Sequence, residues 1–270
     1  MVPGVYDCVS AMTAAAAGFR AVAVSGYCVE ASLLGRPDLG FTGLSDMEQV
    51  ARRIANSVHT PVICDADTGY GDGRHVWDTT RRLEAAGAQG IHIEDQTDPK
   101  RCGGMAGRQV IHAEEMVLKV QSAVGARRTD DLLVIARSDA KESGGLHEVV
   151  RRLNRYADAG ADIAFAAEPY TLEELRVLGQ EVAAPLAICA GVPGWPDSSE
   201  NKETYAELGV RMVLYPFLSL YPAFTAMRRA YADLAAHGAV SPQVAQAEMV
   251  SFNEFNEFIG LSQWESRAQP

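Results

Sequence analysis

The sequence has 270 residues, 47% of them hydrophobic, and carries a formal net charge of −11. This length suits one large hydrophobic core, and α/β barrels routinely form a single domain of about this size. The acidic balance argues against a nucleic-acid partner, because binding to a phosphate backbone requires a positively charged surface. An anionic small molecule would need a local positive group, such as a metal ion, an Arg or a row of backbone N–H groups.

Short apolar runs rich in β-branched residues alternate along the chain with stretches of helical periodicity. Strands are predicted near Val5 and over Ala21–Ser25, Pro61–Cys64, Gly90–Ile93, Leu132–Ala136, Ile163–Ala166, Pro185–Ile188 and Met212–Tyr215. Helices are predicted over Met47–Val58, Val76–Ala88, Ala113–Val124, Leu146–Ala157, Leu172–Val182 and Glu200–Leu208. Uniformly apolar strands are typical of a parallel sheet that is buried on both faces. About eight strand–helix units predict a parallel (β/α)8 TIM-type barrel, with an open doubly wound sheet as the alternative.

Beyond the eight units, helical spacing continues from Pro216 to about His237 and again over Ser241–Ser266. No break in composition marks a linker, so we expect residues 1–270 to form a single α/β-barrel domain with an extra helical segment over residues 241–266. This segment could pack on its own barrel or on a neighbouring subunit. The sequence pattern leaves both arrangements open.

Acidic residues gather where two neighbouring predicted strands end. Asp65 and Asp67 are two residues apart, so both side chains would point to the same face, and Glu94 ends the next strand. Three carboxylates in one partly dry site repel each other and need a cation or a shifted protonation state. Oxygen ligands alone favour Mg²⁺ or Mn²⁺. The alternative is that the two aspartates cap a loop or helix while Glu94 pairs with a cation of the barrel.

Two further groups at strand ends could bind a carboxylate. Arg137 follows the fifth apolar run and offers a bidentate clamp, although it could instead be a structural partner of an acid. Ser25, Gly26 and Tyr27 follow the second strand and offer backbone N–H groups, although an ordinary turn would look the same. Together with the acids, these residues predict an enzyme that uses a metal ion to act on a small 2-oxo or 2-hydroxy carboxylate.

A glycine-rich loop over residues 98–108 follows the acid-bearing fourth strand. Its glycines would allow it to open and close as a lid, and Lys100 and Arg101 beside Cys102 predict a lowered pKa for that thiol. Cys102 could then give or take a proton. A surface basic loop with an incidental thiol is the alternative.

The five cysteines are an odd number without close pairing, which excludes a fully paired disulfide framework. Cys64 and Cys189 lie within apolar runs and are expected to face the core. No run reaches the roughly 18 apolar residues of a membrane span, and the first residues lack the pattern of a secretion signal. We therefore expect a cytoplasmic protein with no membrane partner.

Several short segments, taken together and in order, form a specific pattern: Pro3–Asp7, Ser25-Gly26, Leu34–Gly40, Asp65–Gly71, Glu94–Gln96, Pro99–Gly103 and Ala136–Ala140. With this pattern the sequence resembles the isocitrate lyase and phosphoenolpyruvate mutase superfamily. The resemblance is nearest to the methylisocitrate lyase and carboxyphosphonoenolpyruvate mutase branches, which also carry a lid loop with a Lys-Arg/Lys-Cys-Gly sequence.

For the metal site, the resemblance implies Mg²⁺ bound by Asp65 and Asp67, with Glu94 and Asp38 in its water-mediated shell. It also implies that the C-terminal helix near Phe252–Trp264 is exchanged between subunits, which would give a homo-oligomer, either a dimer or a tetramer.

For the substrate, the resemblance implies that Ser25, Gly26 and Tyr27 hold a carboxylate, while Arg137 clamps an oxygen near the reacting carbon. Cys102 would protonate the carbanion. From the same lid, we assign Lys100 to the catalytic residues and Gly103 to the substrate contacts, and we add Asp65 to those contacts.

Three departures from the superfamily pattern bear on the substrate. Gly104 stands where the lyases usually have His, Glu168 is displaced by one residue, and residues 189–192 replace a polar set on the seventh strand. We therefore predict a Mg²⁺-dependent carbon–carbon lyase that converts a small 2-hydroxy carboxylate, not isocitrate, to an α-keto acid. One alternative is a mutase, decarboxylase or hydrolase of the same superfamily. The other is a homologue that binds metal and carboxylate without catalysis.

Overall fold

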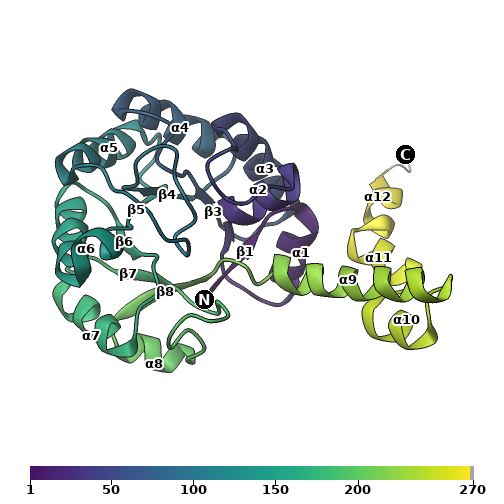
Figure 1. Ribbon diagram of the computed structural model, residues 1–270. Helices are drawn as coiled ribbons and strands as arrows, with labels where there is room; N and C mark the ends of the chain where they lie inside the picture. Colours follow the sequence, from purple (N-terminus) through teal and green to yellow (C-terminus); the bar gives the residue numbers. More distant parts are fainter. Residues whose placement is uncertain (268–270) are drawn as a thin grey trace. The chain divides into compact units, whose positions relative to one another are not determined.

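The computed structural model describes residues 1–267, and the chain divides into two compact units, Met1–Ser219 and Leu220–Pro270. The first unit is a closed barrel of eight parallel strands in which β8 pairs with β1. Figure 1 shows its helices surrounding the strands. The strands are β1 (Val2–Val5), β2 (Val22–Val24), β3 (Val62–Asp65), β4 (Gly90–Glu94), β5 (Leu133–Ser138), β6 (Ile163–Ala166), β7 (Leu186–Cys189) and β8 (Val210–Tyr215). The predicted (β/α)8 barrel is confirmed, and the open sheet is excluded.

Eight helices accompany the strands of this unit: α1 (Cys8–Ala16), α2 (Gly26–Leu34), α3 (Leu44–Ser57), α4 (Gly73–Ala85), α5 (Ala113–Ala126), α6 (Lys141–Asp158), α7 (Leu172–Glu181) and α8 (Lys202–Glu207). The sequence periodicity missed α1 and α2. Both are short and rich in small or uniformly apolar residues, so neither shows a distinct polar face. Local capping sets where they begin: Asp7 accepts the Ser10 N–H at α1, and the Ser25 hydroxyl accepts the Cys28 N–H at α2.

The barrel interior explains why functional side chains meet at one end. Its filling includes Ala23, Ile63, Ile135 and Phe165, each from a different strand. Successive side chains of a strand point to opposite faces, so the residue two positions further on shares the inward direction. Ser25, Asp65 and Arg137 stand in that position after Ala23, Ile63 and Ile135. They therefore belong to the mouth at the carboxyl ends of the strands, where barrel enzymes carry their chemistry.

The second unit is helical, as the sequence predicts, and comprises α9 (Leu220–His237), α10 (Pro242–Glu248), α11 (Phe252–Phe258) and α12 (Leu261–Arg267). An ion pair of 3.1 Å joins Arg229 of α9 to Glu248 of α10. None of the residues in these four helices is buried. Because the structure describes the two units separately, the expectation of a single domain over residues 1–270 stays a prediction. None of the helices in the described part of the chain is long and apolar enough to cross a membrane.

Candidate active site

Asp65 ends β3, and its carboxylate is fixed by two backbone N–H groups. Gly26, the first residue of α2, donates to Oδ2 at 3.1 Å, and Asp67 donates to Oδ1 at 3.0 Å. A Cβ at Gly26 would lie only 2.6 Å from Asp65 Oδ2, so glycine is required for this approach. The sequence predicted that Ser25, Gly26 and Tyr27 offer backbone N–H groups to a substrate carboxylate. These residues stand at the start of α2, and the Gly26 N–H donates to the Asp65 carboxylate.

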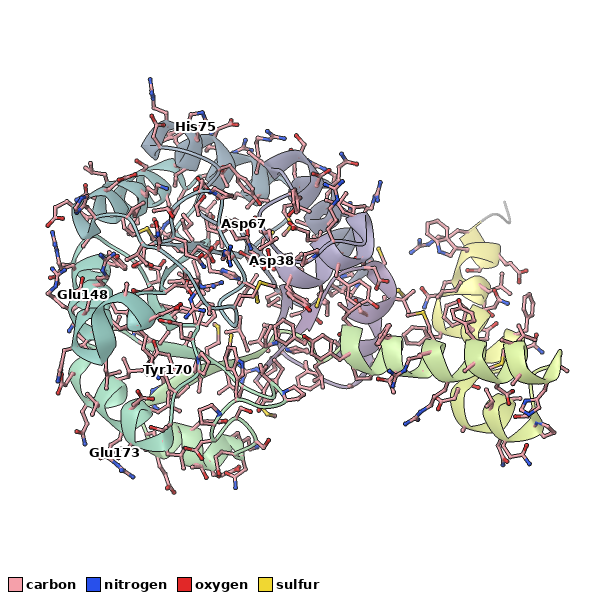
Figure 2. All side chains as sticks on the ribbon, in the orientation of Figure 1. Asp38, Asp67, His75, Glu148, Tyr170 and Glu173 are labelled. Carbon is pink, nitrogen blue, oxygen red and sulfur yellow. The ribbon has the colours of Figure 1, made fainter. Side chains whose placement is uncertain are left out.

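Lys100 supplies the positive charge between two of the acids. Its Nζ lies 2.7 Å from Asp38 Oδ1 and 2.6 Å from Asp67 Oδ1, and all three side chains are buried. Figure 2 places Asp38 and Asp67 beside each other at the barrel mouth. The sequence placed Lys100 next to Cys102 on a basic lid. The structure turns its side chain inward to the carboxylates.

The pKa values follow from burial and mutual repulsion. The pKa of Asp67 is raised to about 6, because burial and the charges of Asp65 and Asp38 together outweigh the opposing charge of Lys100. Burial likewise raises the pKa of Asp38, and it raises that of Glu94 well above its usual range. Burial acts in the same direction on Asp65, but the charges of His92, Lys100 and Arg137 outweigh it, so the pKa of Asp65 is lowered. The four acids thus act as one electrostatic cluster.

The acid cluster has the donor chemistry of a hard dication. Asp38 Oδ1, Asp67 Oδ1 and Glu94 Oε2 are buried oxygens whose contacts are the ion pairs with Lys100 and Arg137, and the buried Glu94 Oε1 accepts no hydrogen bond. Oxygen-only donors of this kind suit Mg²⁺ or Mn²⁺. Within residues 1–267, however, no three His, Cys, Asp or Glu side chains are arranged as a ready metal site. The present positive charges come from Lys100 and Arg137, so a metal ion would compete with Lys100 for Asp38 and Asp67.

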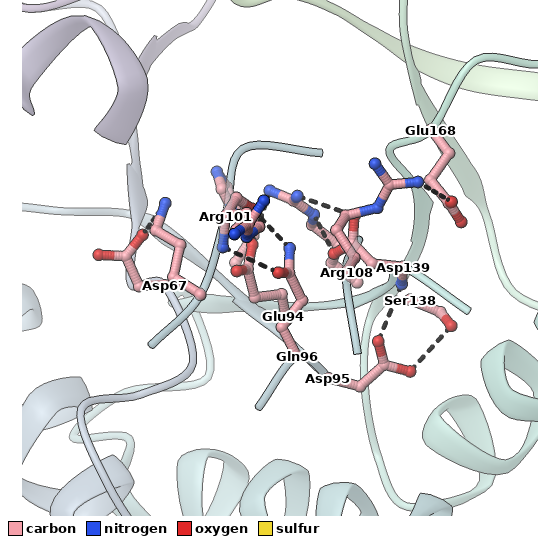
Figure 3. Close-up of polar contacts among 12 residues, drawn as sticks. Asp67, Glu94, Asp95, Gln96, Arg101, Arg108, Ser138, Asp139 and Glu168 are labelled. Carbon is pink, nitrogen blue, oxygen red and sulfur yellow. Dashed lines mark hydrogen bonds and ion pairs between the residues drawn. The ribbon is translucent and has the colours of Figure 1, made fainter. Parts of the chain in front are cut away.

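Arg137 is held by acids on both sides. Its Nη1 lies 2.8 Å from Glu94 Oε2, and its Nε lies 2.8 Å from Asp139 Oδ2. Asp139 is fixed in turn, because its N–H donates to Asp95 at 2.8 Å, and Figure 3 shows Asp95 also accepting from Ser138. This chain of contacts aims the guanidinium at the cavity. Arg137 therefore forms the ion pairs with acids that the sequence left open, and it also lines the cavity.

The lid loop, residues 98–108, lies over the mouth, and Cys102, Gly103 and Gly104 line the cavity beneath it. The Cys102 N–H donates to the Asp38 carbonyl at 3.1 Å, and Arg108 forms a 2.6 Å ion pair with Glu168 (Figure 3). A Cβ at Gly103 would lie 2.7 Å from Arg137 Nη2, so this glycine packs directly against the guanidinium. Glu168, the acid that stands one residue away from its usual position after β6, therefore anchors the lid loop through Arg108.

The predicted lowering of the Cys102 pKa is wrong. Burial raises the pKa of this thiol to about 11, and the charge of Asp38 raises it too, while Arg137 and Lys100 only partly oppose them. Two cations adjacent in sequence do not act as expected, because Lys100 is itself neutralised by acids. The thiol stays protonated at neutral pH, which is the state that a proton donor needs.

The cavity beneath the lid has a volume of about 60 Å³. Of the residues that the sequence predicted for the site, those that line the cavity are Ser25, Tyr27, Asp38, Asp65, Cys102, Gly103 and Arg137. Gly26, Asp67, Glu94 and Lys100 contact these residues from behind without lining the cavity themselves. Further lining residues that sequence reasoning did not assign to the site include His92, Phe165, Cys189, Trp195, Leu214 and Phe217.

A period-two pattern could have found some of these residues. His92 precedes Glu94 by two positions on β4, and so shares its inward face. The expectation that Cys64 faces the core is confirmed, and Cys189 is half-buried and packs against the core residues inside the barrel. Cys189 ends β7 at the mouth and lines the cavity, because the inward direction at a strand end leads into the site. Trp195 lies on the following loop and has no such signal.

Comparison with known proteins places this site in a family. The sequence profile described as phosphoenolpyruvate phosphomutase matches residues 1–235. The chain belongs to this family. It is 36% identical over 259 residues to the 2,3-dimethylmalate lyase of Eubacterium barkeri, covering 96% of this chain and 89% of that protein.

Two solved structures extend the comparison. A 2,3-dimethylmalate lyase, described as a PEP mutase/isocitrate lyase superfamily member, superposes with a TM-score of 0.91 at 37% identity, covering 98% of this chain and 88% of that one. A phosphonopyruvate hydrolase in complex with oxalate and Mg²⁺ gives a TM-score of 0.87 at 29% identity, covering 98% and 91%. The family predicted from the sequence is confirmed, and a carbon–carbon lyase, the predicted enzyme class, is found among its similar proteins.

Proposed function

We propose that this member of the phosphoenolpyruvate phosphomutase family is a Mg²⁺-dependent lyase that cleaves a carbon–carbon bond of a small 2-hydroxy carboxylate and releases an α-keto acid. One observation carries the proposal. Asp38 and Asp65 of a buried cluster of four carboxylates line the same small cavity as the protonated thiol of Cys102, and Asp67 and Glu94 contact this lining from behind. The similarity to 2,3-dimethylmalate lyase and to a Mg²⁺-bound structure supports it.

Asp65 and Asp67 would hold Mg²⁺, with Glu94 and Asp38 in its outer shell. When bound, Mg²⁺ would act as a Lewis acid that makes the substrate hydroxyl more acidic. Mn²⁺ has the same preference for oxygen ligands and could replace it. Lys100 of the lid contacts Asp38 and Asp67 and would give up part of these contacts to the metal.

The substrate would be held from two sides. Ser25, Gly26 and Tyr27 would bind its carboxylate at the start of α2, where Ser25 and Tyr27 line the cavity and the Gly26 N–H donates to Asp65. Arg137 would donate to an oxygen beside the reacting carbon, with Gly103 closing against the guanidinium.

The reaction needs no electron donor or acceptor. The hydroxyl gives up its proton to a base, the oxygen forms the new carbonyl, and the electron pair of the broken carbon–carbon bond passes to the departing carbon. Cys102 would give its thiol proton to that carbon, and the proton taken from the hydroxyl restores the thiol. The closed lid excludes water from the carbanion.

Replacing Cys102 by Ser tests the proposal. A positioned general acid contributes about 10²- to 10⁴-fold, so turnover of a 2-hydroxy diacid with Mg²⁺ should fall by that factor. Binding of oxalate with Mg²⁺, measured by calorimetry, should persist, because the acid cluster is intact. Cys8→Ser is the matched control, since Cys8 lies on α1 outside the cavity lining. Unchanged turnover in the Cys102 variant would remove the thiol from the mechanism, and loss of oxalate binding would contradict the metal site.

A mutase-like, decarboxylase-like or hydrolase-like reaction is the second candidate, favoured by the similarity to the phosphonopyruvate hydrolase. It shares the acid cluster and Arg137, but the bond broken would be in a 2-oxo acid, and in a decarboxylation or hydrolysis the enolate carbon left behind would take its proton from water or from Cys102. The substrates therefore separate the two candidates, because the second would release a product from oxaloacetate or phosphonopyruvate and leave 2-hydroxy diacids unchanged. A metal- and carboxylate-binding homologue without catalysis would bind oxalate and release no keto acid from any 2-hydroxy acid.

We further propose a homo-oligomer, a dimer or tetramer, in which the C-terminal helices are exchanged between subunits. The support is that α9 to α12 bury none of their residues, while Phe252 and Trp264 are 82% and 65% exposed. Light scattering should show a smaller assembly for the Phe252→Glu/Trp264→Glu double variant. An unchanged mass would contradict the exchange. A cytoplasmic location is part of the proposal, consistent with five free cysteines.

A further inference from the structure

We propose that the far side of the cavity is a subsite for an uncharged alkyl group of the substrate, with Trp195 as its specificity-determining residue. This inference rests on the proposed function and names the substrate class: a 2-hydroxy diacid that carries a small alkyl group where a tricarboxylate would carry its third carboxylate. Gly104 of the lid is the residue that leaves room for the Trp195 indole.

The lining of this side is apolar. Phe165 of β6 and Leu214 of β8 are buried, and Phe217, which follows β8, packs its ring against Tyr27 with centroids 4.6 Å apart. Trp195 closes the same side from the loop after β7. An alkyl group placed here leaves water for apolar contacts and is stabilised by the hydrophobic effect.

A charged group placed here would find no free cation. Among the described residues that line the cavity, Arg137 is the one Lys or Arg, and it is already paired with Glu94 and Asp139. Lys100 is taken up by two further acids. An additional carboxylate would lose its hydration without gaining a partner, which disfavours binding.

Trp195 is held in place by its own loop before any ligand arrives. The backbone N–H of Trp195 donates to the Val192 carbonyl at 3.1 Å. The hydroxyl of the buried Ser198 donates to the Val192 carbonyl at 2.9 Å and to the Trp195 carbonyl at 3.3 Å. A Cβ at Gly104 would lie 3.1 Å from Trp195 Cζ2, so a larger lid residue would push the indole away. The lid and the loop after β7 therefore form one preorganised wall.

The size of the cavity limits the alkyl group. The volume of about 60 Å³ belongs to the whole cavity, which must also take the carboxylates and the reacting carbons of the substrate. The space that remains suits a short alkyl substituent. It does not suit a long chain or an aromatic ring.

Two 2-oxo acids of equal length test the subsite by calorimetry in the presence of Mg²⁺. 2-Oxopentanoate ends in a methyl group, and 2-oxoglutarate ends in a carboxylate. The alkyl ligand should bind about 10- to 100-fold more tightly, because burying an unpaired carboxylate is costly. From pyruvate to 2-oxobutanoate to 2-oxopentanoate, affinity should rise about fourfold per methylene.

Substitutions assign the preference to particular residues. Trp195→Ala should remove most of the rise per methylene, whereas Trp77→Ala, at a half-exposed Trp on α4, should leave it unchanged. Cys189→Arg places a cation in the subsite and should shift the preference towards 2-oxoglutarate. Thermal melting shows whether each variant is folded, and if the Cys189 variant is not, the Trp195 comparison decides.

Two results would overturn the subsite while leaving the proposed function intact: equal or tighter binding of 2-oxoglutarate, or an unchanged alkyl preference in Trp195→Ala. Failure of pyruvate and oxalate to bind at all with Mg²⁺ would overturn the proposed function, and the subsite with it.

Discussion

The buried ammonium of Lys100 offers the sharpest test of the site's electrostatics. Lys100→Met keeps most of the side-chain volume and removes the charge between Asp38 and Asp67. At an effective dielectric constant of about 20, each contact of 2.6–2.7 Å corresponds to roughly 6 kcal/mol of Coulomb attraction, most of it offset by desolvation. Breaking a buried pair typically costs about 3–5 kcal/mol, because the remaining charges are left uncompensated.

For a domain of this size, each kcal/mol shifts the melting temperature by about 2–4 °C. The variant should therefore melt about 6–20 °C below the wild type in the presence of a chelator, measured by circular dichroism. Excess MgCl₂ should then stabilise the variant more than the wild type, because a dication can take the place of the missing ammonium.

Lys202→Met is the control. Its ion pair with Glu203 is 3.5 Å long and exposed, so its loss should cost less than about 1 kcal/mol. The reasoning fails if Lys100→Met melts no lower than this control, or if its response to Mg²⁺ does not exceed that of the wild type. In either case the acids would not depend on Lys100 for their charge balance.

Three further outcomes follow from the same geometry. Because burial raises the pKa of Cys102 to about 11, its thiolate fraction at pH 8 is small. Iodoacetamide should modify it far more slowly than a free cysteine, with the rate still rising above pH 9; rapid labelling at pH 7 by mass spectrometry would contradict this. Arg108→Met removes the 2.6 Å lid contact with Glu168, so limited proteolysis should cut residues 98–108 faster than in the wild type, and equal cutting would show that the pair does not hold the lid. Gly26→Ala places a Cβ 2.6 Å from Asp65 Oδ2, so Mg²⁺ affinity by calorimetry should fall at least tenfold, whereas an unchanged affinity would mean that the helix start can shift freely.

The barrel could be predicted from local sequence because its signals are local. Uniformly apolar runs separated by amphipathic stretches reflect burial on both faces of a parallel sheet, and Ile163–Ala166 was predicted with the bounds that the structure has. Ends were less certain: β8 begins at Val210, two residues before the predicted Met212. The helix over Gly26–Leu34 was missed, since it is set by the cap at Ser25 and by packing and lacks a polar face.

The positions of the acids could also be predicted, because a period of two along each strand and the shared end of parallel strands bring Asp65 and Glu94 to one mouth. The charge balance of those acids could not be predicted. It depends on Lys100, whose position is decided by how the lid loop packs over the barrel.

The sequence by itself determined the barrel and which strand ends carry carboxylates, since both follow from periodicity. Only the tertiary structure decided which cation neutralises them, that Cys102 is half-buried with a raised thiol pKa, and that Trp195 closes the cavity beside Gly104. The physical reason is that desolvation and charge pairing at one point are summed over every segment packed around it, and loops far apart in the sequence supply those segments.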